Sequence, residues 1–174
     1  LKVVHNKLSN KIIVYNEYNI PILNFKKTFL RFNSRFTFIY EGKRIAKMIY
    51  HPKPIDYSGP KRFSIILPQP RENRLNGWEN KLSKNMLNDL ILMKKANGKI
   101  CLHMIKPFYK DKSYRIKLLQ TDSVASTKNF AINYDHDKAL EFIKKGKDTF
   151  GILFNKPFTA TLSVAVSIAH MIVA

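Results

Sequence analysis

The sequence predicts an α/β fold, a single domain with a mixed sheet flanked by helices. Runs of β-branched and aromatic residues predict strands before residue 50 and again at 99–105 and 130–132. Apolar residues at helical spacing predict a helix over 78–96. The chain has 174 residues, 45% of them hydrophobic and 12% aromatic, which is enough for a packed core. Strands that alternate with helices indicate the α/β class.

The first fifty residues are expected to be mainly strand. Residues 2–15 favour a strand, and the turn-prone segment 16–19 leads into a second apolar run at 20–23, so this part is predicted to be a β-hairpin. Aromatic and basic residues interleave over 25–49 with stretches of period two. More strand is therefore predicted there, with Glu41 and Gly42 as a turn.

The middle of the chain is expected to be less regular. Residues 51–77 contain five of the eight prolines around one apolar run at 63–67, which predicts an irregular insertion. After the strand at 99–105 we expect a loop over 106–112. A short basic helix is predicted to follow at 113–120.

The last part of the chain is expected to hold a helix and a strand. Residues 138–145 predict a short helix that begins at the N-cap Asp137 and ends at Gly146. The tail, 158–174, alternates large with small side chains, which is typical of a buried strand. A membrane-spanning helix is the minor alternative, because it needs about 20 apolar residues and the tail is shorter.

These elements predict one α/β domain over 1–137 with a C-terminal extension. An inserted β-rich or irregular segment is expected at about 32–76. The extension, 138–174, would hold the short helix and the apolar strand.

Charge is the outlying property of the composition. The chain has 31 Lys and Arg against 12 Asp and Glu, a formal net charge of +19, and a pI near 10.1. Such a balance implies an anionic partner. Basic residues recur from Lys2 to Lys156 instead of gathering in one amphipathic helix, so nucleic acid is favoured and a membrane surface is not expected.

No catalytic or metal-binding constellation is predicted. Cys101 is the only cysteine, so neither an intrachain disulfide nor a Cys-based zinc site can form. The best polar cluster, 135–137 (Asp-His-Asp), consists of consecutive side chains that do not converge on a strand, and a turn or helix start is favoured there. No glycine-rich phosphate loop is present. We therefore expect no enzyme, no cofactor and no small-molecule substrate.

Two segments combine basic residues in ways that suit RNA. Residues 25–44 interleave aromatic rings, which stack on bases, with cations, which neutralise phosphates. An ordinary two-faced strand pair would have the same composition. The loop 106–112, with Arg115 and Lys117 after it, could hold phosphate oxygens together with helix N-terminal amides, or could be a merely solvated loop.

Residues 4–23 and 78–132 resemble the universal small-subunit ribosomal protein S-eleven family in a divergent mitochondrial form. Val4-His5, the run 9–13 (Ser-Asn-Lys-Ile-Ile), and Glu17, Asn19, Ile22 and Leu23 lie in the register of that family's opening hairpin. Residues 106–119 are similar to its stretch K-G-x-G-x-G-R-x-x-x-I-R-x-L, although all three glycines are replaced. The family's basic ending is absent.

The resemblance implies a structural constituent of the mitochondrial ribosomal small subunit, bound to the ribosome in the matrix. Its partners would be ribosomal RNA, neighbouring ribosomal proteins and the messenger RNA path. With the basic segments above, it gives these expected RNA contacts: Asn10, Lys11, Lys26, Lys27, Arg31, Arg35, Lys106, Lys110, Lys112, Arg115 and Lys117.

Two alternatives stay open. Residues 137–146 are similar to a helix in the C-terminal domain of translation initiation factor three, which would fit a ribosome-associated translation or assembly factor. The apolar tail would fit a peripheral subunit of a mitochondrial membrane complex.

Overall fold

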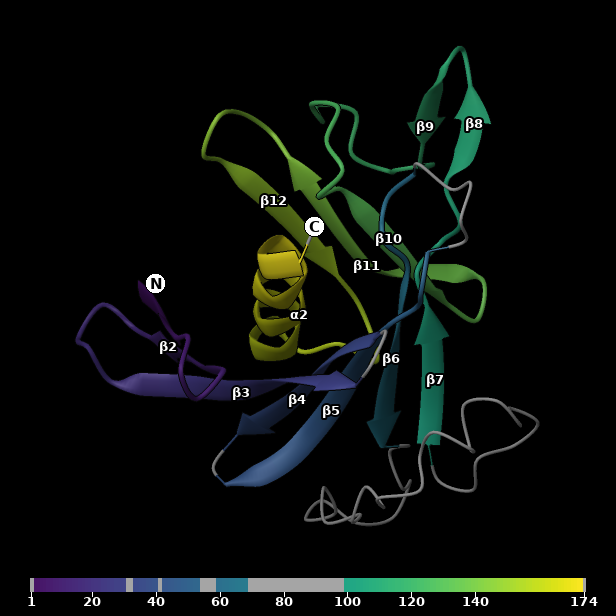
Figure 1. The fold of residues 1–174 in the computed structure, drawn as a ribbon. Helices are drawn as coiled ribbons and strands as arrows, with labels where there is room; N and C mark the ends of the chain where they lie inside the picture. The colour runs from purple at the N-terminus through teal and green to yellow at the C-terminus, as the bar shows by residue number, and fades with distance from the viewer. Residues whose placement is uncertain (1, 31–32, 41, 54–58, 69–98, 174) are drawn as a thin grey trace.

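The structure is a computed structural model that describes residues 2–30, 33–40, 42–53, 59–68 and 99–173 (Figure 1). These ranges form a seven-stranded sheet, a three-stranded sheet, a two-stranded hairpin and a C-terminal helix. Pairing within each sheet is antiparallel throughout.

The large sheet is a meander in which each strand pairs with the next along the chain. Its strands are β1 (Lys2–Asn6), β2 (Lys11–Tyr15), β3 (Pro21–Leu30), β4 (Asn33–Tyr40), β5 (Lys43–Tyr50), β6 (Phe63–Pro68) and β7 (Lys99–His103). Period-two alternation sends Phe25, Phe38 and Ala46, which face one another across β3 to β5, to one buried side. This inner side forms much of the core.

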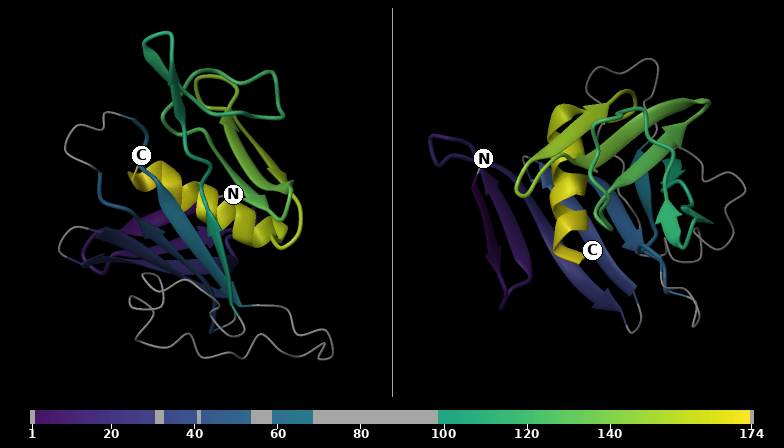
Figure 2. Two further views of the ribbon diagram at one scale, coloured as in Figure 1. Left: turned by 90° about the vertical axis from the view of Figure 1, so that its right-hand side faces the viewer. Right: turned by 90° about the horizontal axis from the view of Figure 1, so that it is seen from above.

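The small sheet and the C-terminal helix complete the core. The sheet consists of β10 (Phe130–Tyr134), β11 (Asp137–Lys144) and β12 (Phe150–Phe154), and the helix is α2 (Ala160–Val173). Helix α2 lies between the two sheets (Figures 1 and 2). A single continuous cluster of buried residues includes side chains from both sheets and from α2. A bridge between Met104 and Ile132 joins the sheets at one edge.

The predicted α/β class is wrong, because the described regular structure is mainly antiparallel strand with one helix. Residues 138–145 were expected to be a helix, but 138–144 belong to β11, which hydrogen-bonds to β10 on one side and β12 on the other. Asp137 is consequently the first residue of a strand and caps no helix. Two flanking strands supply backbone partners that override weak local helix preference.

The apolar tail is also different from its prediction, since it forms α2 instead of a strand. Its serines are compatible with a buried helix because the Ser163 hydroxyl donates to the Thr159 carbonyl and the Ser167 hydroxyl to the Ser163 carbonyl, both at 2.8 Å. Small side chains such as Ala165 and Ala169 are fully buried. No helix in the described part of the chain is long and apolar enough to cross a membrane.

Other predictions had mixed outcomes. The turn at 16–19 and the strands near 99–105 and 130–132 are confirmed, whereas 2–15 divides into two strands. The run at 63–67 becomes β6, an interior strand of the large sheet.

The predicted basic helix at 113–120 is wrong, because β8 (Phe108–Lys110) and β9 (Ser113–Arg115) form a hairpin there. The helix at 78–96 lies outside the described residues, and the division of the chain at 137 stays a prediction.

One histidine is buried at the centre of the core. His170 of α2 is fully buried, and its Nδ1 lies 2.8 Å from the Tyr50 hydroxyl. The rings of Phe63 and Phe130 lie against it, with centroid distances of 5.2 and 4.9 Å. Burial lowers the pKa of His170 to about 4, and a hydrogen bond with the Thr127 backbone partly offsets this lowering.

Because His170 is buried and neutral, we predict that the folded state is less stable at acidic pH. The folded-state pKa of His170 lies below its ordinary value of 6.5, so the unfolded chain binds the extra proton more readily as pH falls from 6.5 to about 4. We expect His170 to contribute a loss of roughly 3 kcal/mol in unfolding free energy across that window, and no further loss below it. Chemical denaturation of wild type and His170→Leu at several pH values tests this; an equal pH slope in both would contradict it.

Candidate functional site

The outer side of the large sheet, opposite α2, gathers basic side chains. Period two places Lys26 on the other side of β3 from the buried Phe25, and Lys47 on the other side of β5 from Ala46 and Met48. We define the cationic face as the basic residues on this outer side: Lys11, Lys26, Arg35, Arg44, Lys47 and Lys99.

Strand register aligns the middle of this face in one row. Lys11 pairs with Lys26, Lys26 with Thr37, and Thr37 with Lys47. Neighbouring strands lie about 4.8 Å apart, so the row from β2 to β5 spans about 14 Å. Arg44 reaches the same side because the β4–β5 register shifts after Phe38, which leaves Arg44 opposite the outward Ile39.

Lys47 lies at the electrostatic centre of the cationic face. Burial lowers the pKa of its ammonium below the usual range. The positive charges of Arg44, Arg35 and Lys99 lower that pKa further. Burial also lowers the pKa of Arg35, and its buried Nε has no hydrogen-bond partner. A donor without an acceptor, among mutually repelling cations, favours an anionic ligand.

No carboxylate balances this charge within the sheet, because the described strands β1 to β7 contain neither Asp nor Glu. A multiply charged anion could therefore contact cations from several strands at once. Lys and Arg bind phosphate oxygens by charge-assisted hydrogen bonds, which are stronger than neutral ones. The arrangement suits binding, and it presents no acid–base pair for a reaction.

The structure brings together only some of the predicted contact residues. Lys11, Lys26 and Arg35 share the cationic face, and Asn10 lies at its margin, where its carbonyl accepts from the Lys27 N–H at 2.9 Å. The Lys27 side chain lies on the inner side, 6.0 Å from the Phe36 ring centroid. Arg31 lies outside the described residues.

The remaining predicted residues lie on or beside the β8–β9 hairpin, at the opposite end of the molecule from β1 and β2 (Figures 1 and 2). Lys110 ends β8, and Lys112 lies in the turn with a positive φ of 60°. Arg115 forms an ion pair with Asp111 at 3.1 Å. Lys106 and Lys117 flank the hairpin and are exposed. These residues form a separate basic segment, and their contact with an anion stays a prediction.

The expected contacts did not include Lys47 and Lys99, and Arg44 was included only as part of the basic segment 25–44. A signal for Lys47 was present, because it stands between two apolar residues that period two sends to the other side. Arg44 joins this side only through the register shift, and Lys99 only through the pairing of β6 with β7. Neither feature is visible in the local sequence.

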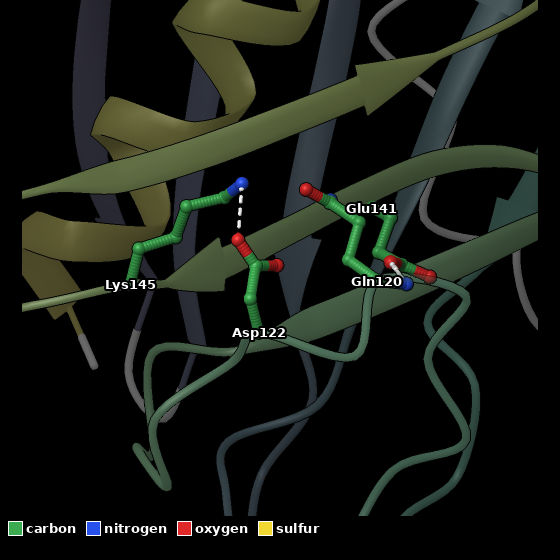
Figure 3. Close-up of polar contacts among 4 residues, drawn as sticks. All are labelled: Gln120, Asp122, Glu141 and Lys145. Atoms are coloured by element: carbon green, nitrogen blue, oxygen red, sulfur yellow. Dashed lines mark hydrogen bonds and ion pairs between the residues drawn. The ribbon is translucent and has the colours of Figure 1, made fainter.

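The buried carboxylate of Glu141 is hydrogen-bonded to the backbone of a neighbouring segment (Figure 3). Its two oxygens accept hydrogen bonds from the N–H groups of Leu119 and Gln120 at 2.8 and 3.0 Å. Nearby, Asp122 and Lys145 form an ion pair at 2.7 Å (Figure 3). Glu141 therefore fastens the irregular segment after β9 to the small sheet, and its role is structural.

A second polar cluster lies on β6 and β7. The Ser64 hydroxyl lies 2.6 Å from His51 Nε2 and 2.7 Å from His103 Nδ1, but Ser64 is fully buried and cannot meet a substrate. Burial raises the pKa of the nearby Cys101 thiol to about 11, which makes it a poor nucleophile. Within the described ranges no group of three metal-ligating side chains occurs. Asp135 lies in the β10–β11 turn with a φ of 54°, so of the two structures expected at 135–137, a turn or a helix start, the turn is found.

Comparison with known proteins supplies the family. A model of the Tub family matches residues 2–171. The chain belongs to the Tub family. Proteins called king tubby from Drosophila pseudoobscura pseudoobscura and Drosophila sechellia are each 25% identical over 132 residues, covering 72% of this chain. The matches cover 29% and 30% of those proteins, so this chain spans less than a third of the length of these curated relatives.

Membership of the Tub family overturns the ribosomal S-eleven resemblance. Its short matches were consistent with any hairpin and basic loop, and the Tub match covers nearly the whole chain. A role in the ribosomal small subunit, ribosomal RNA and protein partners, and a mitochondrial location are therefore wrong, as are the translation-factor and membrane-complex alternatives. High positive charge indicated an anionic partner without specifying its class.

Repulsion at the cationic face predicts a stability gain when one cation is removed. We expect Lys47→Gln to raise the unfolding free energy by a few tenths of a kcal/mol at low ionic strength, because Arg35, Arg44 and Lys99 repel Lys47. Added salt should shrink the gain. Urea denaturation at two salt concentrations measures it. Lys112→Gln, in the β8–β9 turn, is the charge-matched control; an equal gain there would contradict the prediction.

We predict that removing the Glu141 carboxylate destabilises the fold strongly. Glu141→Ala removes both acceptors of two backbone N–H groups, and we expect roughly 3 kcal/mol less unfolding free energy. Glu141→Gln keeps one carbonyl acceptor and should lose less. Asp122→Ala breaks only the exposed ion pair with Lys145 and should change little. Denaturant unfolding of the three variants measures the order, and similar losses for Glu141→Ala and Asp122→Ala would contradict it.

Proposed function

We propose that this chain is a non-enzymatic module that binds membrane lipids whose headgroups carry several phosphates, as polyphosphorylated inositol lipids do, through the cationic face. The observation that carries the proposal is the convergence of Arg35, Arg44 and Lys99 on Lys47, without a carboxylate on any described strand of the large sheet. Repulsion among these cations favours the binding of an anion.

Phosphate groups match the chemistry of this face better than single carboxylates. A phosphate monoester carries nearly two negative charges and three acceptor oxygens at neutral pH, so a few such groups could engage cations from four strands. Lys26 and Lys11 offer exposed ammonium groups, while Arg35 offers the unsatisfied Nε donor.

A membrane surface suits the shape and charge of this site. The cations come from several strands of one sheet side instead of from one helix, and the whole chain has a net charge of +19. Anionic leaflets attract basic residues by about 1 kcal/mol for each Lys or Arg near the surface. A membrane surface was not expected from the sequence, because the basic residues are scattered along the chain. Strand pairing nevertheless brings Lys11, Lys26 and Lys47 into one row.

The test is co-sedimentation with phosphatidylcholine vesicles that contain phosphatidylinositol bisphosphate. We expect wild type to bind them, and Lys26→Glu with Lys47→Glu to lose about tenfold or more in affinity, since each change reverses a charge at the face. Soluble inositol trisphosphate should raise the melting temperature of wild type, because a ligand of the folded state stabilises it. The double variant should show little rise.

The matched control reverses two charges elsewhere. Lys110→Glu with Lys112→Glu changes the net charge equally on the β8–β9 hairpin, and we expect it to keep most of the vesicle affinity. Vesicles in which phosphatidylserine supplies the same surface charge separate headgroup recognition from general attraction. Equal binding to both vesicle types, or equal losses in the two double variants, would contradict the proposal.

A further inference from the structure

The turn between β1 and β2 presents a large apolar side chain to solvent. Leu8 is 98% exposed, the highest fraction among the large hydrophobic side chains in the described ranges. Single exposed apolar residues are ordinary, so exposure alone carries no conclusion. The structure and surroundings of this turn distinguish Leu8 from such residues.

The turn is a defined one. The Asn6 side-chain oxygen accepts hydrogen bonds from the N–H groups of Leu8 and Ser9 at 3.0 and 3.1 Å. Asn10 closes the turn in the left-handed region, with a φ of 52°. Two backbone donors at the tip thus have a partner within the protein. Satisfying these two donors within the protein lowers the cost of moving the tip into a medium of low polarity.

The turn also adjoins the cationic face directly. Lys11 follows the turn and pairs with Lys26 on β3. The backbone N–H of Lys27 donates to the Asn10 carbonyl at 2.9 Å, which ties the turn to β3. Lys7 lies beside Leu8 at the tip and is exposed. The first acidic residue of the chain is Glu17, at the next turn.

We propose that Leu8 inserts into the boundary between headgroups and acyl chains of the same bilayer whose phosphorylated headgroup the cationic face binds. The inference rests on the proposed function. An apolar side chain flanked by lysines suits this depth, because the ammonium groups of Lys7 and Lys11 can stay at the level of the phosphates while Leu8 goes below them. A lipid surface is the partner that can bind the cations through its phosphates and Leu8 through its acyl chains.

The first test separates insertion from headgroup binding. We expect Leu8→Ser to lower affinity for phosphatidylinositol bisphosphate vesicles by about tenfold, the scale of burying one leucine. Its affinity for soluble inositol trisphosphate should not change. Leu119→Ser is the matched control, because Leu119 is 61% exposed in the segment held by Glu141 and lies away from the cationic face. Equal vesicle affinities of wild type and Leu8→Ser would overturn the inference.

The second test measures depth directly. Cys101 is the only cysteine, so a Cys101→Ser background allows an environment-sensitive fluorophore to be attached at Leu8→Cys or at Leu119→Cys. We expect membrane-embedded quenchers to dim the label at position 8 and to leave the label at 119 unaffected. Vesicle binding without quenching at position 8 would overturn the insertion and leave the proposed function standing. Failure to bind both vesicles and inositol trisphosphate would overturn both.

Discussion

The burial of α2 between two sheets is the constraint on which the other features depend. A helix of 14 residues with no Asp, Glu, Lys or Arg must be enclosed by apolar surface, and both sheets supply it. Because the inner side of the large sheet packs against α2, the polar residues that alternate with its apolar residues lie on the outer side. The same period of two that fills the core with phenylalanine therefore concentrates Lys26 and Lys47 on the opposite side.

This division explains how a strongly basic chain can fold stably. The cations that repel one another are kept on the outer side of the large sheet, away from the main core, where a charge would cost most. The buried carboxylate of Glu141 is held by two backbone donors, and burial keeps His170 uncharged near pH 7. The residual repulsion around Lys47 is retained where a ligand could relieve it, which is how binding sites trade stability for function.

Membership of the Tub family changes how the charge is interpreted. A net charge of +19 favours any polyanion, so it could not distinguish ribosomal RNA from a lipid surface. The arrangement of the charges is more specific, since it places Lys11, Lys26 and Lys47 in one row next to an apolar turn. Such a surface combines two attractions, electrostatic and hydrophobic, that a bilayer can satisfy together.

The sequence by itself determined the strands of the first fifty residues, the turn at 16–19, the positive charge and the scarcity of catalytic groups, because these depend on local composition and on period two. Only the tertiary structure decided the rest. Residues 138–145 carry a helix-like composition but lie between two strands whose backbone groups they must satisfy. Residues 160–173 alternate like a strand but enter a space shaped for a helix. The cationic face is a product of long-range pairing, since β2, β3, β5 and β7 bring Lys11, Lys26, Lys47 and Lys99 to one side, and pairing register is not encoded in any single segment.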